Sequence, residues 1–238
     1  MMYNRTCQIE NKDVEIHEKL LQRIFNKDDE LVIFDIGACE GINSIRYARM
    51  FPNSKVYAIE PLIDNIQIIK DNTLNYKIEN IEIFRTCLSD KIEEAIFFVS
   101  SGIPERYQNL ELNWNFGNKS SSLLCPNKTK EIFPWLKFEE SIKIRTNTLT
   151  NFCYENEIVR IDFIHMDVQG AELKVLNGAT QILSKIKSIW LEVEEVPLYK
   201  DQPLKKDIED FFYKNGFTKV IDTVGKVSGD QLYVKNDM

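Results

Sequence analysis

The chain has 238 residues, 43% of them hydrophobic and 28% charged, so it is long enough for one large α/β domain with a buried core. Its formal net charge of −7 disfavours DNA or RNA as the main partner, because nucleic-acid-binding proteins usually carry a basic face. No apolar run approaches the roughly 20 residues that cross a bilayer, and the polar N-terminus lacks the apolar core of a signal peptide. We therefore expect a cytoplasmic protein without a membrane span.

The five cysteines are scattered, odd in number and without a C-x-x-C pair. This arrangement argues against a zinc site and against a disulfide scaffold, and it predicts free thiols. Asp167 and Glu194 are hard oxygen ligands that suit magnesium. Two carboxylates without a defined spacing are too few to predict a metal, so we expect none.

Residues 1–30 form a polar lead-in that contains one amphipathic helix. His17 belongs to this helix, and its charged neighbours predict a solvated side chain. The apolar positions of the helix recur at helical spacing: Ile16, Leu20, Leu21 and Ile24. Beyond the lead-in, the sequence pattern predicts a strand at 31–34, a helix at 42–50, a strand at 56–59, a helix at 63–75, and strands at 81–85 and 95–100.

The regular pattern stops between residues 101 and 141, where three prolines interrupt any helix. Such a long loop inside a compact domain is usually functional or disordered, and its aromatic residues argue against disorder. We interpret it as an insertion that caps the active site and supplies substrate contacts, with Trp114 and Ser121 as candidates. The alternative is a surface elaboration that packs its aromatic side chains on the core.

Regular patterns return after this segment, and residues 31–238 are expected to form a single domain. The last predicted pair of strands is compatible with an antiparallel edge, and Gly216 is a plausible end of the helix before it. In chain order, the pattern predicts a strand at 142–145, a helix at 148–157, a strand at 160–166, a helix at 173–187, a strand at 188–193, a helix at 204–215, and strands at 217–223 and 231–235.

The β-α-β unit at 31–61 carries a glycine turn after its first strand. Gly37 and Gly41 let the backbone turn sharply and let a ligand approach, and the next helix presents free N–H groups. Glu60 follows Gly41 by about the 20 residues expected of a ribose-binding acid. The acids Asp35 and Glu40 would repel a pyrophosphate but suit a cationic ligand, such as a sulfonium with an α-amino group.

The resulting D-x-G-x-x-x-G pattern is typical of S-adenosylmethionine-dependent methyltransferases. A turn that uses glycine only for packing is one alternative, although the ribose acid at the right distance argues against it. A nicotinamide-dependent oxidoreductase is another, and it predicts a third glycine and a neutral turn. A non-catalytic module that kept the fold is disfavoured by the intact glycine turn and by Glu60.

Several segments together resemble the FkbM-type methyltransferases over about residues 31–235: VIFDIGACEGINSIRYA, AIEP, DFIHMDVQGAELKVLNGA, WLEVE and GDQLYV. The resemblance implies the class I methyltransferase fold, a Rossmann-like, doubly wound and mostly parallel seven-stranded sheet with an antiparallel last strand. It also implies O-methylation with S-adenosylmethionine. Two positions depart from the family: many relatives carry Glu at Gln169, and Thr150 replaces a common Asp.

The resemblance also assigns cofactor-binding positions at the carboxyl ends of the strands. The methionine side would lie on the turn, the ribose on Glu60, and the adenine beside the residues that follow the second and third strands. The residues concerned are Asp35, Gly37, Ala38 and Gly41 for methionine, Glu60 for ribose, and Pro61, Leu62, Cys87, Leu88 and Ser89 for adenine.

A hydroxyl acceptor must lose a proton during methyl transfer, so a general base is useful. His165 and Asp167 alternate along one strand and share a face at its carboxyl end, which makes both candidates for catalysis. His165 is alternatively a buried structural histidine. Glu172 suits the first turn of the following helix, and Glu194 is a candidate for substrate contacts.

The sequence therefore predicts an O-methyltransferase that acts on a hydroxyl of a sugar, sugar nucleotide or glycan precursor, in polysaccharide biosynthesis. N-methylation of a small amine or amide and O-methylation of a natural product are the alternatives. The acceptor and the oligomeric state, including a homo-oligomer, stay open at this point.

Overall fold

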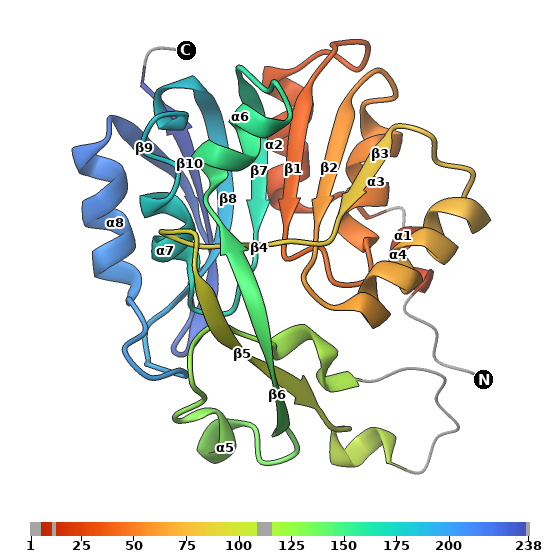
Figure 1. Cartoon of the computed structure of the whole chain (residues 1–238). Coiled ribbons are helices and arrows are strands. Elements are labelled where there is room, and N and C mark those ends of the chain that lie inside the picture. Colours follow the sequence, from red (N-terminus) through yellow and green to blue (C-terminus); the bar gives the residue numbers. More distant parts are fainter. Residues whose placement is uncertain (1–5, 11–12, 109–115, 237–238) are drawn as a thin grey trace.

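The computed structural model describes residues 6–10, 13–108 and 116–236. Its centre is a seven-stranded sheet with the strand order β3-β2-β1-β7-β8-β10-β9 (Figure 1). These strands are β1 (Val32–Ile36), β2 (Lys55–Ile59), β3 (Ile81–Phe84), β7 (Ile161–Met166), β8 (Ile186–Glu194), β9 (Phe217–Asp222) and β10 (Ser228–Lys235).

Five of the strands are joined by parallel pairings, β3 to β2, β2 to β1, β1 to β7 and β7 to β8. The last strand in sequence, β10, is antiparallel to both β8 and β9. The strand order reverses between β1 and β7, which is the point where open α/β sheets bind ligands. The predicted fold class is thereby confirmed.

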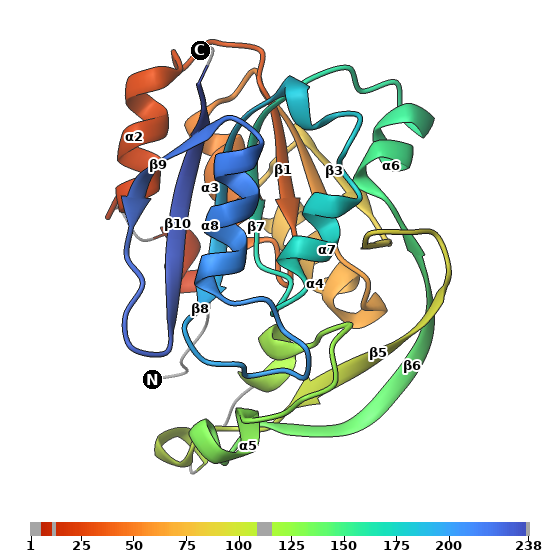
Figure 2. The ribbon, with the colours of Figure 1, turned by 90° about the vertical axis from the view of Figure 1, so that its left-hand side faces the viewer.

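Helices cover both faces of the sheet, which Figure 2 shows edge-on. On one face, Leu21 of α2 and Tyr47 of α3 pack against Ile33 and Phe163 of the central strands. On the other face, α6, α7 and α8 pack over Phe34 and its neighbours. The helices are α1 (Thr6–Glu10), α2 (Ile16–Ile24), α3 (Ile42–Met50), α4 (Ile63–Asn75), α5 (Thr129–Ile132), α6 (Leu149–Glu155), α7 (Glu172–Asn177) and α8 (Lys205–Lys214).

A long antiparallel hairpin extends below the carboxyl edge of the main sheet (Figure 1). Its arms, β5 (Glu94–Ser101) and β6 (Lys137–Asn147), form a separate three-stranded sheet with β4 (Cys87–Leu88). Residues 102–136 join the two arms, and we call them the hairpin segment. They contain α5 and the 3₁₀ turns η1 (Glu105–Tyr107) and η2 (Phe116–Ser120).

Two predicted element boundaries are wrong. The strand expected at 142–145 begins at Lys137, because the outer part of β6 alternates exposed charged side chains that give no apolar signal. The helix expected at 173–187 ends at Asn177. A Cβ added at Gly178 would lie 2.1 Å from the Ser89 carbonyl oxygen, so the chain turns there against the loop after β4. A 3₁₀ turn, η3 (Leu183–Lys185), leads into β8.

The helix α2 buries a different stripe from the predicted one. Ile16 is 53% exposed, whereas Glu18 is buried and its carboxylate accepts hydrogen bonds from Arg46 of α3 at 2.5 and 2.7 Å. The expectation of a solvated His17 is also wrong. Its ring stacks on Trp190 of β8, with centroids 4.5 Å apart, and its Nε2 lies 2.8 Å from the Tyr47 hydroxyl oxygen. Partners on β8 and α3 explain the burial, and neither is visible in the local sequence.

Two further findings concern the described part of the chain. None of its helices has the length and apolar character needed to cross a membrane. The cysteines at positions 39, 87, 125 and 153 are free thiols.

The contacts of α2 generate a test of whether the lead-in belongs to the folded unit. Leu21 is fully buried, so Leu21→Ala should lower the free energy of unfolding by about 2–5 kcal/mol, measured by urea denaturation. Leu74 is 78% exposed, and Leu74→Ala should change that free energy by less than about 0.5 kcal/mol. Equal stability of the two variants would show that α2 contributes nothing to the core.

Candidate active site

The glycine turn after β1 lies directly against the turn after β7. Gly37 has a φ of 84°, and a Cβ added to it would lie 1.9 Å from the carbonyl oxygen of Asp167. The backbone N–H groups of Gly37 and Ala38 both donate to the Ile59 carbonyl oxygen, at 2.9 and 3.0 Å. Because only glycine permits this approach, the ends of β1, β2 and β7 meet in one place.

The carboxylate of Glu60, at the end of β2, is buried and held by backbone groups. One of its oxygens accepts the Cys39 N–H and the other accepts the Leu62 N–H, both at 2.9 Å. Burial raises the pKa of Glu60 to about 7, although these N–H groups oppose the shift. The Asn65 side chain also hydrogen-bonds to this carboxylate. A carboxylate has about four lone-pair sites, so Glu60 keeps the capacity to accept one further hydrogen bond.

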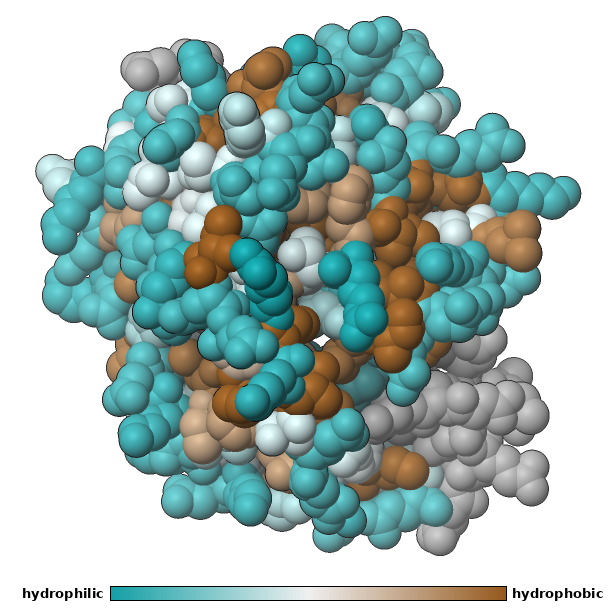
Figure 3. All heavy atoms as spheres, in the orientation of Figure 1, coloured by the Kyte–Doolittle hydropathy of each residue, from teal (hydrophilic) through white to brown (hydrophobic). Residues whose placement is uncertain are grey.

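Two adjoining cavities open at this edge of the sheet and share part of their walls. The larger has a volume of about 350 Å³, and the smaller is a narrow slot of about 50 Å³. Figure 3 shows apolar surface gathered along the junction between the main sheet and the hairpin. The residues common to both cavities are Gly37, Cys39, Lys119 and Asp167.

A cluster of carboxylates lies where β7 and β8 end. Gln169 donates from its Nε2 to Asp167 Oδ1 at 2.7 Å and to Glu192 Oε2 at 2.8 Å. Burial raises the pKa of Asp167, whereas the Gln169 donor and the Lys119 ammonium oppose the shift. Burial also raises the pKa of Glu192 well above its usual range, and the nearby Asp167 carboxylate adds to this effect.

His165 lines the larger cavity and is part of a buried polar chain. Its Nδ1 lies 2.5 Å from the Tyr47 hydroxyl oxygen, and its Nε2 lies 3.2 Å from the Asn43 side-chain nitrogen. Tyr47 continues the chain to His17. Burial lowers the pKa of His165 to about 3, so the ring is neutral near pH 7.

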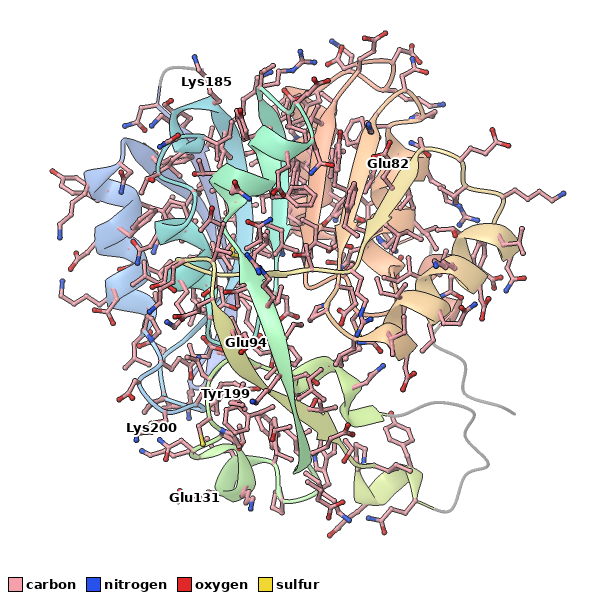
Figure 4. The ribbon with its side chains drawn as sticks, viewed as in Figure 1. Glu82, Glu94, Glu131, Lys185, Tyr199 and Lys200 are labelled. Atoms are coloured by element: carbon pink, nitrogen blue, oxygen red, sulfur yellow. The ribbon has the colours of Figure 1, made fainter. Side chains whose placement is uncertain are left out.

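The hairpin segment is tied to both turns of the site. Asn118 donates from its Nδ2 to Glu40 Oε1 at 3.0 Å, and Glu40 belongs to the glycine turn. Ser122 donates from its hydroxyl to the Gln169 carbonyl oxygen at 2.8 Å. Tyr199, labelled in Figure 4 beside β5, has its hydroxyl oxygen 2.8 Å from the Ser120 carbonyl oxygen. Residues 118–122 of the segment therefore contact both turns.

The structure brings most of the predicted site residues together. Those on the wall of one or both cavities are Gly37, Ala38, Glu60, Pro61, Cys87, Leu88, Ser121, His165 and Asp167. The others lie behind or beside the walls. Trp114 lies outside the described residues.

Five predicted residues lie off the cavity walls. Asp35 is buried behind the glycine turn and accepts a hydrogen bond from the Ser44 hydroxyl at 2.5 Å, while burial raises its pKa to about 6. Gly41 packs against α4, and Leu62 reaches the site only through its N–H to Glu60. Ser89 and Glu194 are buried outside the walls of both cavities.

Sequence reasoning missed several residues of the cavity walls. Trp190 and Asp230 belong to the segments WLEVE and GDQLYV, on which the resemblance rests, but neither residue received a role. Asn43 directly follows the glycine turn, in the first turn of α3, and this position could have indicated a place at the site. Nothing in the local sequence indicated Lys119, because the hairpin segment shows no periodic pattern of apolar residues.

No cluster of three or more His, Cys, Asp or Glu side chains with metal-binding geometry occurs among residues 6–10, 13–108 and 116–236. The carboxylates at the ends of β7 and β8 are instead bonded to the amide of Gln169.

Comparisons with known proteins agree with this architecture. A family model described as "Methyltransferase FkbM domain" matches residues 35–219. The 2-O-methyltransferase NoeI of Sinorhizobium fredii is 26% identical over 81% of this chain and 74% of its own length. The AMB antimetabolite synthetase AmbE of Pseudomonas aeruginosa is also 26% identical, over 91% of this chain, but the chain spans only 11% of AmbE.

Among solved structures, the chain is similar to the methyltransferase FkbM of Methylobacillus flagellatus. The TM-score is 0.51 and the sequence identity is 14%, over 88% of this chain and 44% of that one. At this identity the likeness concerns the fold alone, and the chain spans less than half of that protein.

The raised pKa of Glu60 predicts a dependence of stability on pH. Between the usual pKa of 4.5 and the value of about 7 in the folded chain, the unfolded chain loses this proton more readily. Stability therefore falls as pH rises through this window, by up to about 3 kcal/mol from this group. Glu60→Gln should flatten the fall in unfolding free energy measured from pH 4.5 to 8, because Gln does not titrate.

Glu79 is exposed, so Glu79→Gln is the matched control and should keep the slope of the parent. An equal slope for Glu60→Gln and the parent would mean that Glu60 is not desolvated.

Proposed function

The chain belongs to the FkbM family of S-adenosylmethionine-dependent methyltransferases, and from this premise we propose that it methylates a hydroxyl group of a sugar, sugar nucleotide or glycan precursor. One observation carries the proposal. The cavity beside the ribose acid Glu60 adjoins a larger cavity, and Asp167 stands where the two meet. The name of the relative NoeI, a 2-O-methyltransferase, supports a hydroxyl acceptor.

The residues at the smaller cavity fit the cofactor. Glu60 keeps a lone pair for a ribose hydroxyl, and Pro61, Cys87 and Leu88 offer a mainly apolar wall for adenine. Gly37 and Ala38 would hold the methionine portion. Asn118, Lys119 and Ser121 of the hairpin segment supply part of the wall of this cavity.

The remaining predicted cofactor residues are assigned supporting roles. Asp35 fixes the start of α3 through its bond with Ser44. Leu62 holds Glu60 through its N–H, and Gly41 lets α4 pack closely against the turn. Ser89 bonds to Asp90 and stabilises the loop after β4.

In the proposed mechanism, S-adenosylmethionine supplies a methyl group on a positively charged sulfur and leaves as the neutral thioether S-adenosylhomocysteine. Asp167, at the junction of the cavities, accepts the proton of the acceptor hydroxyl. His165 has protein partners at both ring nitrogens, so we assign it to orienting the wall rather than to proton transfer. Trp190 and Asp230 lie on the acceptor side of the larger cavity.

A small amine is the second candidate acceptor. Carboxyl groups of Glu15, Glu40, Asp167 and Asp230 line the larger cavity together with the cationic Arg46 and Lys119, and the excess of acidic side chains favours a cationic group. The similarity to part of AmbE keeps a natural-product hydroxyl as a further alternative. We propose polysaccharide biosynthesis as the biological setting because a sugar hydroxyl is the leading acceptor.

These assignments predict different effects of substitutions on cofactor binding and on turnover. Isothermal titration should show S-adenosylhomocysteine binding in the micromolar range or tighter. Radiolabelled methyl transfer should be detected with a panel of free sugars, sugar nucleotides and small amines, and most strongly with a hydroxyl acceptor. Asp167→Asn should lower kcat at least about 100-fold, because the base is lost, while the Kd for S-adenosylhomocysteine changes less than about threefold.

Asp210 is an exposed residue of α8, and Asp210→Asn is the matched control that should retain parental turnover. Absence of S-adenosylhomocysteine binding would contradict the cofactor assignment. Unchanged kcat in Asp167→Asn would remove Asp167 from the mechanism, and methylation of amines alone would replace the hydroxyl proposal with the second candidate.

A further inference from the structure

Gln169 adopts a backbone conformation that side chains rarely take. It has a φ of 54°, in the turn between β7 and α7, and Gly170 beside it has a φ of 90°. Glycine adopts the left-handed region without the steric penalty that a Cβ brings. A glutamine at such a position near a candidate site indicates that its side chain has a use that outweighs the penalty.

The side chain of Gln169 is fully bonded within the protein. Both N–H groups of Nε2 are directed at carboxylates, to Asp167 at 2.7 Å and to Glu192 at 2.8 Å. Oε1 lies 3.0 Å from the hydroxyl oxygen of Tyr199, which can donate to it. An amide nitrogen donates and an amide oxygen accepts, so this orientation of the amide matches the two carboxyl groups and the Tyr199 hydroxyl, whose single proton also faces the Ser120 carbonyl oxygen.

The two carboxylates are thereby held close together, each bonded to the same nitrogen atom. Burial disfavours the charged form of both groups, and the Asp167 charge raises the pKa of Glu192 further. For Asp167, the N–H donor of Gln169 and a hydrogen bond with the Glu192 carboxyl group oppose the effect of burial on its pKa. The charged and titratable groups that surround Asp167 are Glu192 and Glu194 on β8, Asp230 on β10, Glu172 at the start of α7, Asp35 on β1 and Lys119 of the hairpin segment.

We propose that Gln169 is a positioning residue for methyl transfer, which holds the Asp167 carboxylate ionised and aimed at the acceptor and links it to the hairpin segment. This role rests on the proposed function of Asp167 as the base. In it, Asp167 takes the proton that the acceptor hydroxyl loses, and Gln169 itself exchanges no proton.

The link to the hairpin segment runs through two contacts of Gln169. Its carbonyl oxygen accepts the Ser122 hydroxyl at 2.8 Å. The hydroxyl of Tyr199 lies between Gln169 Oε1 and the Ser120 carbonyl oxygen, at 3.0 and 2.8 Å. A movement of residues 120–122 would therefore change the partners of Gln169, so the orientation of the base depends on the position of these three residues.

The test is a carbon-13 NMR titration of the side-chain carboxyl groups in the full chain with bound S-adenosylhomocysteine, with the Asp167 signal assigned by its loss in Asp167→Asn. Gln169→Glu removes the two N–H donors and adds a negative charge. It should raise the pKa of Asp167 by about one unit or more. The acid limb of kcat against pH should move upward by the same amount, while the Kd for S-adenosylhomocysteine changes less than about threefold.

Gln181 is exposed, and Gln181→Glu adds the same charge away from the site, so it should leave the titration of Asp167 as in the parent. Gln169→Gly removes the amide while relieving the backbone, and it gives the same readout if Gln169→Glu fails to fold. An unchanged titration of Asp167 in these variants overturns the positioning role even where methyl transfer is present. Absence of methyl transfer by the parent overturns the proposed function, and this role with it. The two failures can be told apart because the titration of Asp167 needs no acceptor.

Discussion

The whole site depends on the contact between the turn after β1 and the turn after β7. Gly37 makes this contact possible, because a Cβ there would lie 1.9 Å from the Asp167 carbonyl oxygen. Asp167 continues the pairing of the two strands through its N–H, which donates to the Ile36 carbonyl oxygen at 3.0 Å. Glu60 after β2 and the carboxylates at the ends of β7 and β8 are consequently held at one edge of the sheet, next to residues 118–122 of the hairpin segment.

Buried charge is the second constraint. Asp35, Glu60, Asp167 and Glu192 are desolvated near one another, and burial raises the pKa of each. Such an arrangement opposes folding at neutral pH and favours a ligand that brings positive charge and hydrogen-bond donors. A sulfonium with ribose hydroxyls has both properties. In this account, cofactor binding offsets part of the cost of burying these carboxyl groups.

The strands of the main sheet could be predicted from the sequence because the patterns that indicate them are local. The apolar runs of β1 and β7 are buried on both faces, so they stand out without knowledge of their partners. The site was only partly predictable. Glu60 follows from its spacing, but the burial of His17 depends on Trp190, which is distant in sequence. Asn118 was missed because its partners lie on the glycine turn and α4, and nothing in the local sequence of the hairpin segment indicates them.

A crystal structure of the chain with S-adenosylhomocysteine tests the central claim most directly. The account predicts ribose hydroxyls within hydrogen-bonding distance of the Glu60 carboxylate and the sulfur beside the cavity that contains Asp167, under the hairpin segment. A ligand bound away from the carboxyl edge of β1 and β2, or a ribose without contact to Glu60, would contradict it.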